Sequence, residues 1–365
     1  MRPRLFDVLV AAVRPLTPQV NEYLLRAPDG GPLPAYEAGA HIELHWTMPD
    51  GEPMLRHYSL IGGDALRDDP PGTWRIAVQR EDRARGSADI HRRFVPGMTL
   101  TCSHPLHHFR MDRRDRHSVL IAGGIGITPI LSMLRSVVRR GCSFDMVYTA
   151  RSAERMAYRQ EVETLAGTHG RLHDTGTQGR LDLIAYLAAQ PAGATAYVCG
   201  PASLIQAVKD AAASLGWDPA RVRSETFAAA PSAEDVGFDV ELRASGRTLR
   251  VPAGATILDT LTAAGLHPLY DCRRGECGLC PVPVLAADGP LLHRGRYLSA
   301  GERAAEKAPP APVRSSGSPT IVFVDLPESG DPLHDNNGVA EVWEPGAVVI
   351  AAGQVNDVRL YRDLV

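Results

Sequence analysis

The sequence predicts a multidomain protein with an antiparallel β-barrel, a doubly wound α/β domain and a small α+β domain, in that order. Three observations support this. Short alternating strands fill about the first 110 residues, strand and helix alternate from His117, and a hairpin with a short helix follows Gly237. A chain of 365 residues is long enough for two or three domains. We place the domains at residues 1–113, 114–230 and 231–326, with residues 327–365 as an extension of unassigned role.

The first two domains differ in the period of their apolar residues. His41 to Trp46 and Trp74 to Val78 alternate and are bounded by Gly and Pro, which is typical of a barrel of antiparallel strands. The second domain instead repeats a buried strand followed by a helix, which predicts a parallel sheet. Its expected strands are Ser118–Ala122, Ser143–Thr149 and Ala196–Cys199, and its expected helices are Ile130–Arg140 and Leu204–Leu215.

The third domain follows a small, polar and acidic run, Ala228 to Glu234, which we interpret as a linker. Gly237 to Ala244 and Thr248 to Val251 predict a hairpin, and Ile257 to Ala264 predicts a helix. The domain should end near Leu326. Beyond it, the apolar run 346–352 could add one more strand.

Composition excludes several classes of protein. The net charge of −3 gives no basic surface for nucleic acid, and no stretch reaches the roughly 18 to 20 apolar residues of a membrane-spanning helix. Three of the six cysteines lie within nine residues, which indicates a metal site in a reducing compartment better than a disulfide framework. We therefore expect a cytoplasmic protein that binds neither nucleic acid nor membrane.

The cysteine segment carries the most specific chemical signal. Cys272, Cys277 and Cys280 have the C-x4-C-x2-C spacing of plant-type [2Fe–2S] ferredoxins. Thiolates at this spacing can converge on one face of a loop, and the intervening glycines let backbone N–H groups approach the sulfurs. A zinc loop or three structural thiols is the alternative.

Two motifs in the first domain resemble those of the ferredoxin-reductase superfamily. Arg56-His57-Tyr58-Ser59-Leu60 is similar to its R-x-Y-S-L motif, and Arg85-Gly86-Ser87 resembles its second phosphate-binding turn. Chemically, an Arg can neutralise a phosphate, a Tyr can pack on the isoalloxazine or ribityl chain, and a Ser hydroxyl can reach flavin N5. The resemblance implies a flavin, with FMN favoured over FAD.

The second domain carries a glycine loop between a strand and a helix. Glycines there let the backbone approach a pyrophosphate, and the helix N-terminus favours its charge. Val198-Cys199-Gly200-Pro201 resembles the superfamily's C-G-P motif, which implies that Cys199 and Thr128 lie beside the nicotinamide. Cys199 could otherwise be a packing thiol. Arg151 would meet the adenosine ribose, although it could be a surface charge, and NADH is favoured over NADPH. The cofactor-binding residues expected here are Gly123, Gly124, Gly126, Thr128, Pro129, Arg151, Cys199, Gly200, Pro201 and Phe227.

Taken together, residues 1 to 326 resemble the phthalate dioxygenase reductase family. The ferredoxin part of this resemblance rests on the cysteine spacing and on His293-Arg294, Leu298-Ser299 and Glu302-Arg303. The resemblance implies a β-grasp fold for the third domain. It also implies an NAD(P)H-dependent electron-transfer reductase of an oxygenase or demethylase system, with a terminal oxygenase, Rieske-type or similar, as partner. Ser59, Thr128 and Cys199 are the expected residues at the hydride transfer.

One departure from the family pattern leaves the iron–sulfur cluster open. A [2Fe–2S] cluster needs four ligands, and no cysteine follows Cys280 in the 365 residues. A surrogate ligand such as Asp325, His334 or Asp335 could complete the site, the cluster could be absent, or the segment past about Glu306 could be altered. Two other functions therefore stay open: an NADH:flavin or quinone oxidoreductase without a cluster, and a non-catalytic redox scaffold.

Overall fold

The computed structural model describes most of the first two domains and parts of the third. It describes residues 4–51, 53–62, 72–81, 85–227, 237–242, 245–253, 255–266, 281–287, 320–323 and 347–349. The chain divides into two compact units, one reaching Phe227 and one beginning at Ala228. The predicted linker and the three clustered cysteines lie outside the described residues.

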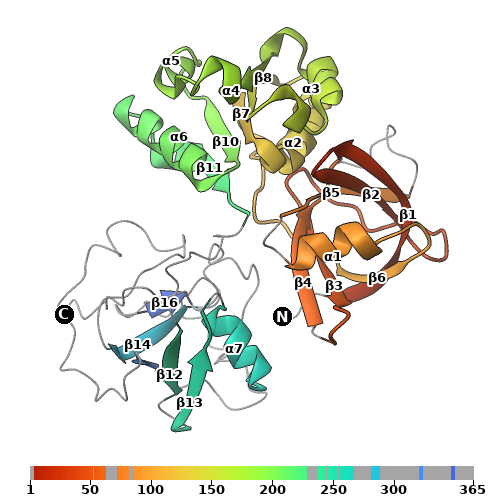
Figure 1. Cartoon of the computed structure of the whole chain (residues 1–365). Coiled ribbons are helices and arrows are strands. Elements are labelled where there is room, and N and C mark those ends of the chain that lie inside the picture. The colour runs from red at the N-terminus through yellow and green to blue at the C-terminus, as the bar shows by residue number, and fades with distance from the viewer. Residues whose placement is uncertain are drawn as a thin grey trace. The chain divides into compact units, whose positions relative to one another are not determined.

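The first domain is a six-stranded antiparallel barrel, as predicted (Figure 1). Its strands are β1 (Leu5–Thr17), β2 (Val20–Arg26), β3 (His41–Thr47), β4 (Pro53–Ser59), β5 (Thr73–Gln79) and β6 (Thr99–Ser103), in the order β4-β3-β6-β1-β2-β5. The two ends of the sheet meet where Ile61 N donates to Arg75 O over 2.8 Å. Helix α1 (Arg85–Arg93) is anchored by the fully buried Asp89, which accepts a 3.0 Å hydrogen bond from Trp46 Nε1.

The second domain is the predicted doubly wound sheet, with all strands parallel. Its strands are β7 (His117–Gly123), β8 (Ser143–Ala150), β9 (Gly170–Asp174), β10 (Thr195–Cys199) and β11 (Val222–Glu225), in the order β11-β10-β7-β8-β9. Its α-helices are α2 (Ile127–Arg140), α3 (Arg159–Ala166), α4 (Thr175–Gln178), α5 (Leu183–Ala188) and α6 (Ala202–Ser214). Its short 3-10 helices are η1 (Gly124–Gly126), η2 (Ala153–Arg155), η3 (Gly167–His169) and η4 (Pro219–Arg221).

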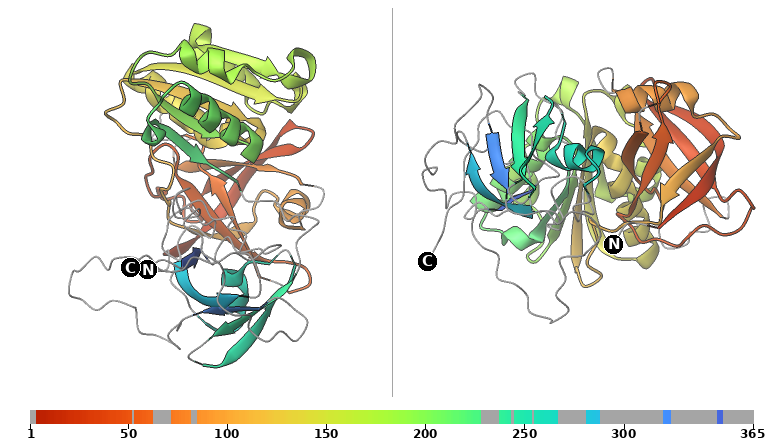
Figure 2. Two further views of the ribbon diagram at one scale, coloured as in Figure 1. Left: turned by 90° about the vertical axis from the view of Figure 1, so that its left-hand side faces the viewer. Right: turned by 90° about the horizontal axis from the view of Figure 1, so that it is seen from below.

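Both faces of this sheet are covered by helices (Figure 2). Alternate residues of β7 explain this, because neighbours along a strand point to opposite faces. Leu120 and Ala122 pack in the same cluster as α2 and α3, whereas Val119 and Ile121 pack with α5 and α6. The strand order reverses between β7 and β10, and a crevice at such a switch point is where open α/β sheets bind ligands.

The second unit contains the predicted α+β domain. Its elements are β12 (Phe238–Leu242), β13 (Arg247–Val251), α7 (Ile257–Ala263), β14 (Pro281–Ala287), β15 (Thr320–Phe323) and β16 (Ala347–Val349). The antiparallel β12–β13 hairpin and α7 confirm the expected elements. The sheet order is β13-β12-β15-β14-β16, so the run 346–352 does add a strand, which pairs antiparallel with β14.

Candidate functional site

The flavin motif occupies the end of β4 and the residue after it. Cross-strand partners in the β3–β4 pair place Arg56 and Tyr58 on one face and His57 and Ser59 on the other. Tyr58 is half-buried against the barrel core and Arg56 is exposed. Burial raises the pKa of Tyr58, so its phenol keeps its proton and can donate a hydrogen bond. Leu60 is fully buried and holds the end of the motif in the core.

The hydroxyl of Ser59 is suited to a bound group. Ser59 is only 4% exposed, and its Oγ has no hydrogen-bond partner among the described residues. A buried hydroxyl without a partner carries a cost that a polar ligand atom can remove. The expected contact of Ser59 with a flavin nitrogen is therefore chemically compatible with this position.

His57 is held by a buried carboxylate on its own face of the sheet, which is the face opposite Arg56 and Tyr58. Glu43 on β3 accepts from the ring nitrogens of His45 and His57, each at 3.2 Å. Burial alone would raise the pKa of Glu43, but these two histidines outweigh it and bring the pKa to about 2. Glu43 is thus ionised at neutral pH and orients the His57 ring. In this register His57 and Tyr58 lie on opposite faces of β4, so His57 stabilises the motif from the face that Tyr58 does not occupy.

The second flavin motif lies beside the first. Arg85-Gly86-Ser87 forms the first turn of α1, and Ser87 Oγ accepts a 3.0 Å hydrogen bond from Glu81 N. A Cβ on Gly86 would lie 3.3 Å from Arg56 Nε. The helix N-terminus and the Arg56 guanidinium therefore share one location, and both favour an anion such as a phosphate.

The glycine loop and the C-G-P turn meet backbone to backbone at the switch point. A Cβ on Gly126 would lie 2.3 Å from Cys199 O and 2.7 Å from Gly200 N, and a Cβ on Gly123 would lie 2.9 Å from Pro201 Cδ. Gly124 has φ +55°, which other residues adopt rarely. Glycine, which lacks a Cβ, allows this approach, and α2 begins directly after the loop. The N–H groups and dipole of a helix N-terminus favour an anion such as a pyrophosphate.

The other predicted residues of this domain are distributed around that junction. Pro129 lies in the first turn of α2, and the hydroxyl of Thr128 donates to Ile125 O at 3.1 Å. Cys199 is fully buried at the end of β10. Arg151 is exposed just after β8, and Phe227 is half-buried against the core of the α/β domain.

Sequence reasoning missed a second set of polar residues, at the junction of barrel and α/β domain. Arg75 interrupts an otherwise apolar strand yet is only 8% exposed, and Glu22, on the neighbouring strand β2, is 2% exposed. A charged residue inside a buried strand was the available signal, because such residues are rarely buried unless paired.

Metal and membrane features complete the description. Cys272, Cys277 and Cys280 lie outside the described residues, and within those residues no group of three or more His, Cys, Asp or Glu could hold a metal ion. In the part of the chain that the structure describes, no helix is long and apolar enough to cross a membrane.

Comparison with known proteins agrees with this architecture. A family model for an oxidoreductase NAD-binding domain matches residues 120–210, and one for a 2Fe-2S iron-sulfur cluster binding domain matches residues 240–311. The chain is 38% identical to the heme-dependent oxidative N-demethylase beta subunit of Ectopseudomonas mendocina (strain ymp), over 87% of this chain and 98% of that protein. It is 42% identical to the phenoxybenzoate dioxygenase subunit beta of Ectopseudomonas oleovorans, over 77% of this chain and 85% of that protein.

A solved structure is similar to this chain over most of its length. Phthalate dioxygenase reductase, described as a modular structure for electron transfer from pyridine nucleotides to [2Fe-2S], superposes with a TM-score of 0.69 at 27% identity. The match covers 88% of this chain and 98% of that one. The chain belongs to the phthalate dioxygenase reductase family, whose members are the electron-transfer oxidoreductases of oxygenase and demethylase systems.

Proposed function

We propose that this chain accepts hydride from NADH at a bound FMN and delivers electrons singly to a terminal oxygenase. The observation that carries the proposal is the backbone contact between Gly126 and Cys199, where a Cβ would lie 2.3 Å from the Cys199 carbonyl. This contact brings the glycine loop, which we propose binds the pyrophosphate, next to the buried thiol of Cys199 at the switch point of the sheet. The loop and the flavin motifs belong to the same compact unit. When bound, the flavin supplies the conversion of the two electrons of one hydride into single-electron transfers.

In this proposal the residues of the chain bind the nucleotide and the flavin and orient them for hydride transfer. Gly123, Gly124 and Gly126 admit the pyrophosphate, and the α2 N-terminus neutralises part of its charge. Thr128 and Cys199 line the nicotinamide position, while Ser59 donates toward the flavin. Hydride transfer needs the two reacting atoms held about 3 to 3.5 Å apart, which requires a fixed relation between barrel and α/β domain.

The choice of cofactors rests on fewer residues. Arg56 and the first turn of α1 supply one phosphate site, which is what FMN requires, and this favours FMN over FAD. Arg151 is exposed beyond β8, where a 2′-phosphate would have to be held. We favour NADH because a single exposed guanidinium gives little selectivity for that phosphate. The clustered cysteines support a reducing, cytoplasmic location.

The iron–sulfur step is the part of the proposal for which the sequence lacks a ligand. Cys272, Cys277 and Cys280 supply three thiolates, and a [2Fe–2S] cluster takes four ligands. This favours a second candidate function, an NADH:flavin or quinone oxidoreductase in which electrons leave directly from the flavin. Cys277→Ser separates the two functions, since it should abolish NADH-dependent electron delivery to the oxygenase in the first and leave NADH-dependent reduction of the flavin or quinone acceptor unchanged in the second.

The test is the spectrum of anaerobically purified protein with iron and acid-labile sulfide assayed, followed by EPR after NADH addition. Flavin bands with a ferredoxin-like shoulder and a rhombic reduced signal support the electron-transfer reductase. Flavin bands that NADH bleaches, without iron, support the second candidate. A chain that binds no flavin and oxidises no NADH would be a redox scaffold, and both enzymatic proposals would fail.

A further inference from the structure

A buried polar cluster joins the barrel to the α/β domain at a distance from the predicted cofactor motifs. We name it the interdomain cluster, and its members are Glu22, Arg75, Arg135, Tyr158 and Glu161. Its centre is Arg75 on β5, whose side chain is 9% exposed. Arg75 Nε donates to Glu22 Oε1 at 2.8 Å within the barrel, and Arg75 Nη2 donates to Glu161 Oε2 on α3 at 3.0 Å.

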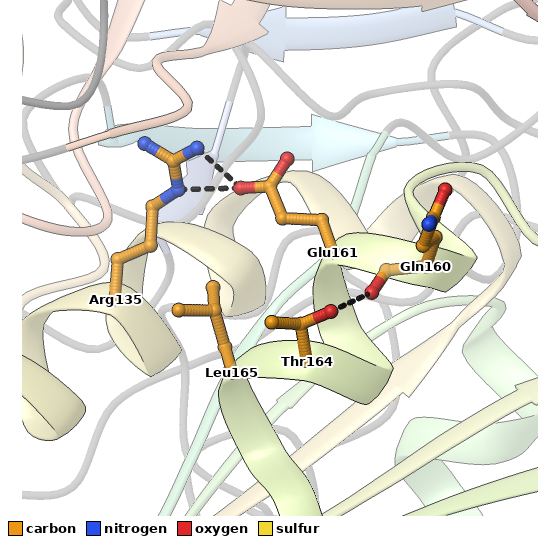
Figure 3. A pocket seen from close by; sticks show the side chains of 5 residues that line it. All are labelled: Arg135, Gln160, Glu161, Thr164 and Leu165. Atoms are coloured by element: carbon orange, nitrogen blue, oxygen red, sulfur yellow. Dashed lines mark hydrogen bonds and ion pairs between the residues drawn. The ribbon is translucent and has the colours of Figure 1, made fainter.

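The α/β side of the cluster ties two helices together. Glu161 lies in the first turn of α3 and also accepts from Arg135 Nε of α2 at 2.6 Å (Figure 3). A cavity of about 350 Å³, lined by Arg135, Gln160, Glu161, Thr164 and Leu165, opens beside this pair. Because Glu161 binds guanidiniums from β5 and from α2, it couples the barrel to the helix that begins at the glycine loop.

Tyr158 is a member of the cluster whose backbone is strained. Its hydroxyl donates to Glu22 Oε1 at 3.1 Å, and the Arg75 guanidinium lies 5.2 Å from the centre of its ring. Tyr158 has φ +59°, and among the described residues it alone adopts a positive φ without being glycine. Backbone strain of this kind persists where the surroundings over-determine a conformation, and it occurs often at functional positions.

The cluster is connected to both cofactor motifs through the backbone. Arg75 O accepts the 2.8 Å hydrogen bond from Ile61 N, two residues beyond Ser59. Ser132 on α2 donates from its hydroxyl to Gly62 O. The segment that follows the flavin motif is therefore held by β5 and by α2, and the same two elements meet through Glu161.

We infer that the interdomain cluster is a positioning device: it fixes α2, and with it the glycine loop, relative to the flavin motif, so that hydride transfer occurs at reacting distance. This inference rests on the proposed function. No member of the cluster contacts the predicted cofactor residues through its side chain in any interaction described above. Its members act through the placement of α2 and of the Ile61–Gly62 segment.

Arg75 and Tyr158 both keep their protons at neutral pH. Burial alone would lower the pKa of Arg75, but Glu161 and Glu22 outweigh this and raise it. Burial, with Glu22 beside the hydroxyl, raises the pKa of Tyr158. Removing one charged partner would leave the other charge buried and uncompensated, and this strongly destabilises a buried network.

The experiment compares Glu161→Gln and Arg75→Met with the unchanged chain. Glu161→Gln keeps a similar side-chain shape while removing the charge and one of the two oxygens that accept from Arg75 and Arg135. The matched control is Glu163→Gln on the same helix, because Glu163 pairs only with the half-exposed Arg159 in the interactions found there. Anaerobic stopped-flow measures flavin reduction by NADH and by 4-deuterated NADH, and dithionite reduction and flavin content are measured in parallel.

We expect hydride transfer to slow by about tenfold to a hundredfold in both cluster variants, since a displacement of about 1 Å has an effect of that size. The isotope effect should be retained or increase, while flavin content, dithionite reduction and the flavin midpoint potential stay unchanged. The control should match the unchanged chain. Hydrogen exchange in the flavin-free protein should become faster around Ile61 and Ser132 in the cluster variants alone.

Rates within twofold of the unchanged chain in both cluster variants, or unchanged exchange at Ile61 and Ser132, would overturn the inference. Equal slowing in Glu163→Gln would overturn it as well, because that residue lies outside the cluster. If the unchanged chain itself is not reduced by NADH, the proposed function fails instead. The exchange measurement, which uses no cofactor, then still decides whether the cluster docks the two domains.

Discussion

Adding one methyl group to Gly126 tests the junction on which the proposed nicotinamide site depends. In Gly126→Ala the new Cβ would lie 2.3 Å from Cys199 O, 2.5 Å from its carbonyl carbon and 2.7 Å from Gly200 N. Carbon atoms in contact prefer about 3.5 to 4.0 Å, so the glycine loop and the C-G-P turn must separate by roughly 1 Å. All three atoms belong to backbone, so no side chain can rotate away to relieve the contact.

The structural cost should be about 1 to 3 kcal/mol of unfolding free energy, the range for an extra group in a packed interior. The functional cost should lie at the upper end of the same range, because a shift of about 1 Å at a reacting centre lowers rates by about a hundredfold, which corresponds to about 2.7 kcal/mol of activation free energy. We expect NADH-dependent ferricyanide reduction to fall by that factor while flavin content is retained. Gly31→Ala is the control, since its Cβ would approach only the side chain of Asp29. Activity within threefold of the unchanged chain, with unchanged stability, would refute this account of the junction.

Three further predictions concern stability and reactivity. The low pKa of Glu43, about 2, means that its contribution to stability is present above its ordinary value of 4.5 and is lost as pH falls toward 2. Between pH 7 and pH 3, urea unfolding should show a loss of unfolding free energy that is about 2 kcal/mol larger in the unchanged chain than in Glu43→Gln, and equal losses would contradict this. Burial raises the pKa of Cys102 to about 12, so iodoacetamide should modify the half-buried Cys142 before Cys102 in the native protein, as peptide mass spectrometry would show; equal labelling of these two cysteines contradicts this. Thr256→Ala removes the N-cap that accepts from Asp259 N at 3.0 Å and should destabilise the second unit by about 1 kcal/mol, measured by thermal unfolding; no change would mean that the cap is dispensable.

The parts of the site that could be predicted from sequence are those in which local chemistry allows few residue types. Gly123 and Gly126 are of this kind, because only glycine permits two backbones to approach so closely, and the motif can be recognised without knowing the partner. The barrel strands at His41–Trp46 and Trp74–Val78 were predictable for a similar reason, since a period of two is visible within six residues. The roles assigned to individual cofactor-binding residues remain predictions.

The interdomain cluster could not be predicted in this way. Arg75 pairs with Glu22 across 53 residues and with Glu161 across 86, and nothing local in the sequence indicates which carboxylate meets which guanidinium. The strain at Tyr158 is equally invisible, since the residues around it do not require a positive φ. Such features depend on how the two domains pack against each other. The apolar surfaces that drive this packing are compatible with many different pairings of charged residues, so the sequence does not indicate which pairing occurs.

That packing explains why a polar cluster is needed at all. Ile61 and Ala77 of the barrel share one apolar cluster with Ile127 and Met133 of α2, so the hydrophobic effect already holds the two domains together. Apolar contact, however, is non-directional and tolerates small sliding motions. Hydrogen-bonded ion pairs impose directions, and Arg75 imposes them on β5, β2 and α3 at once. The apolar core therefore accounts for the stability of the unit, while the precision that hydride transfer requires comes from the few charged groups buried beside it.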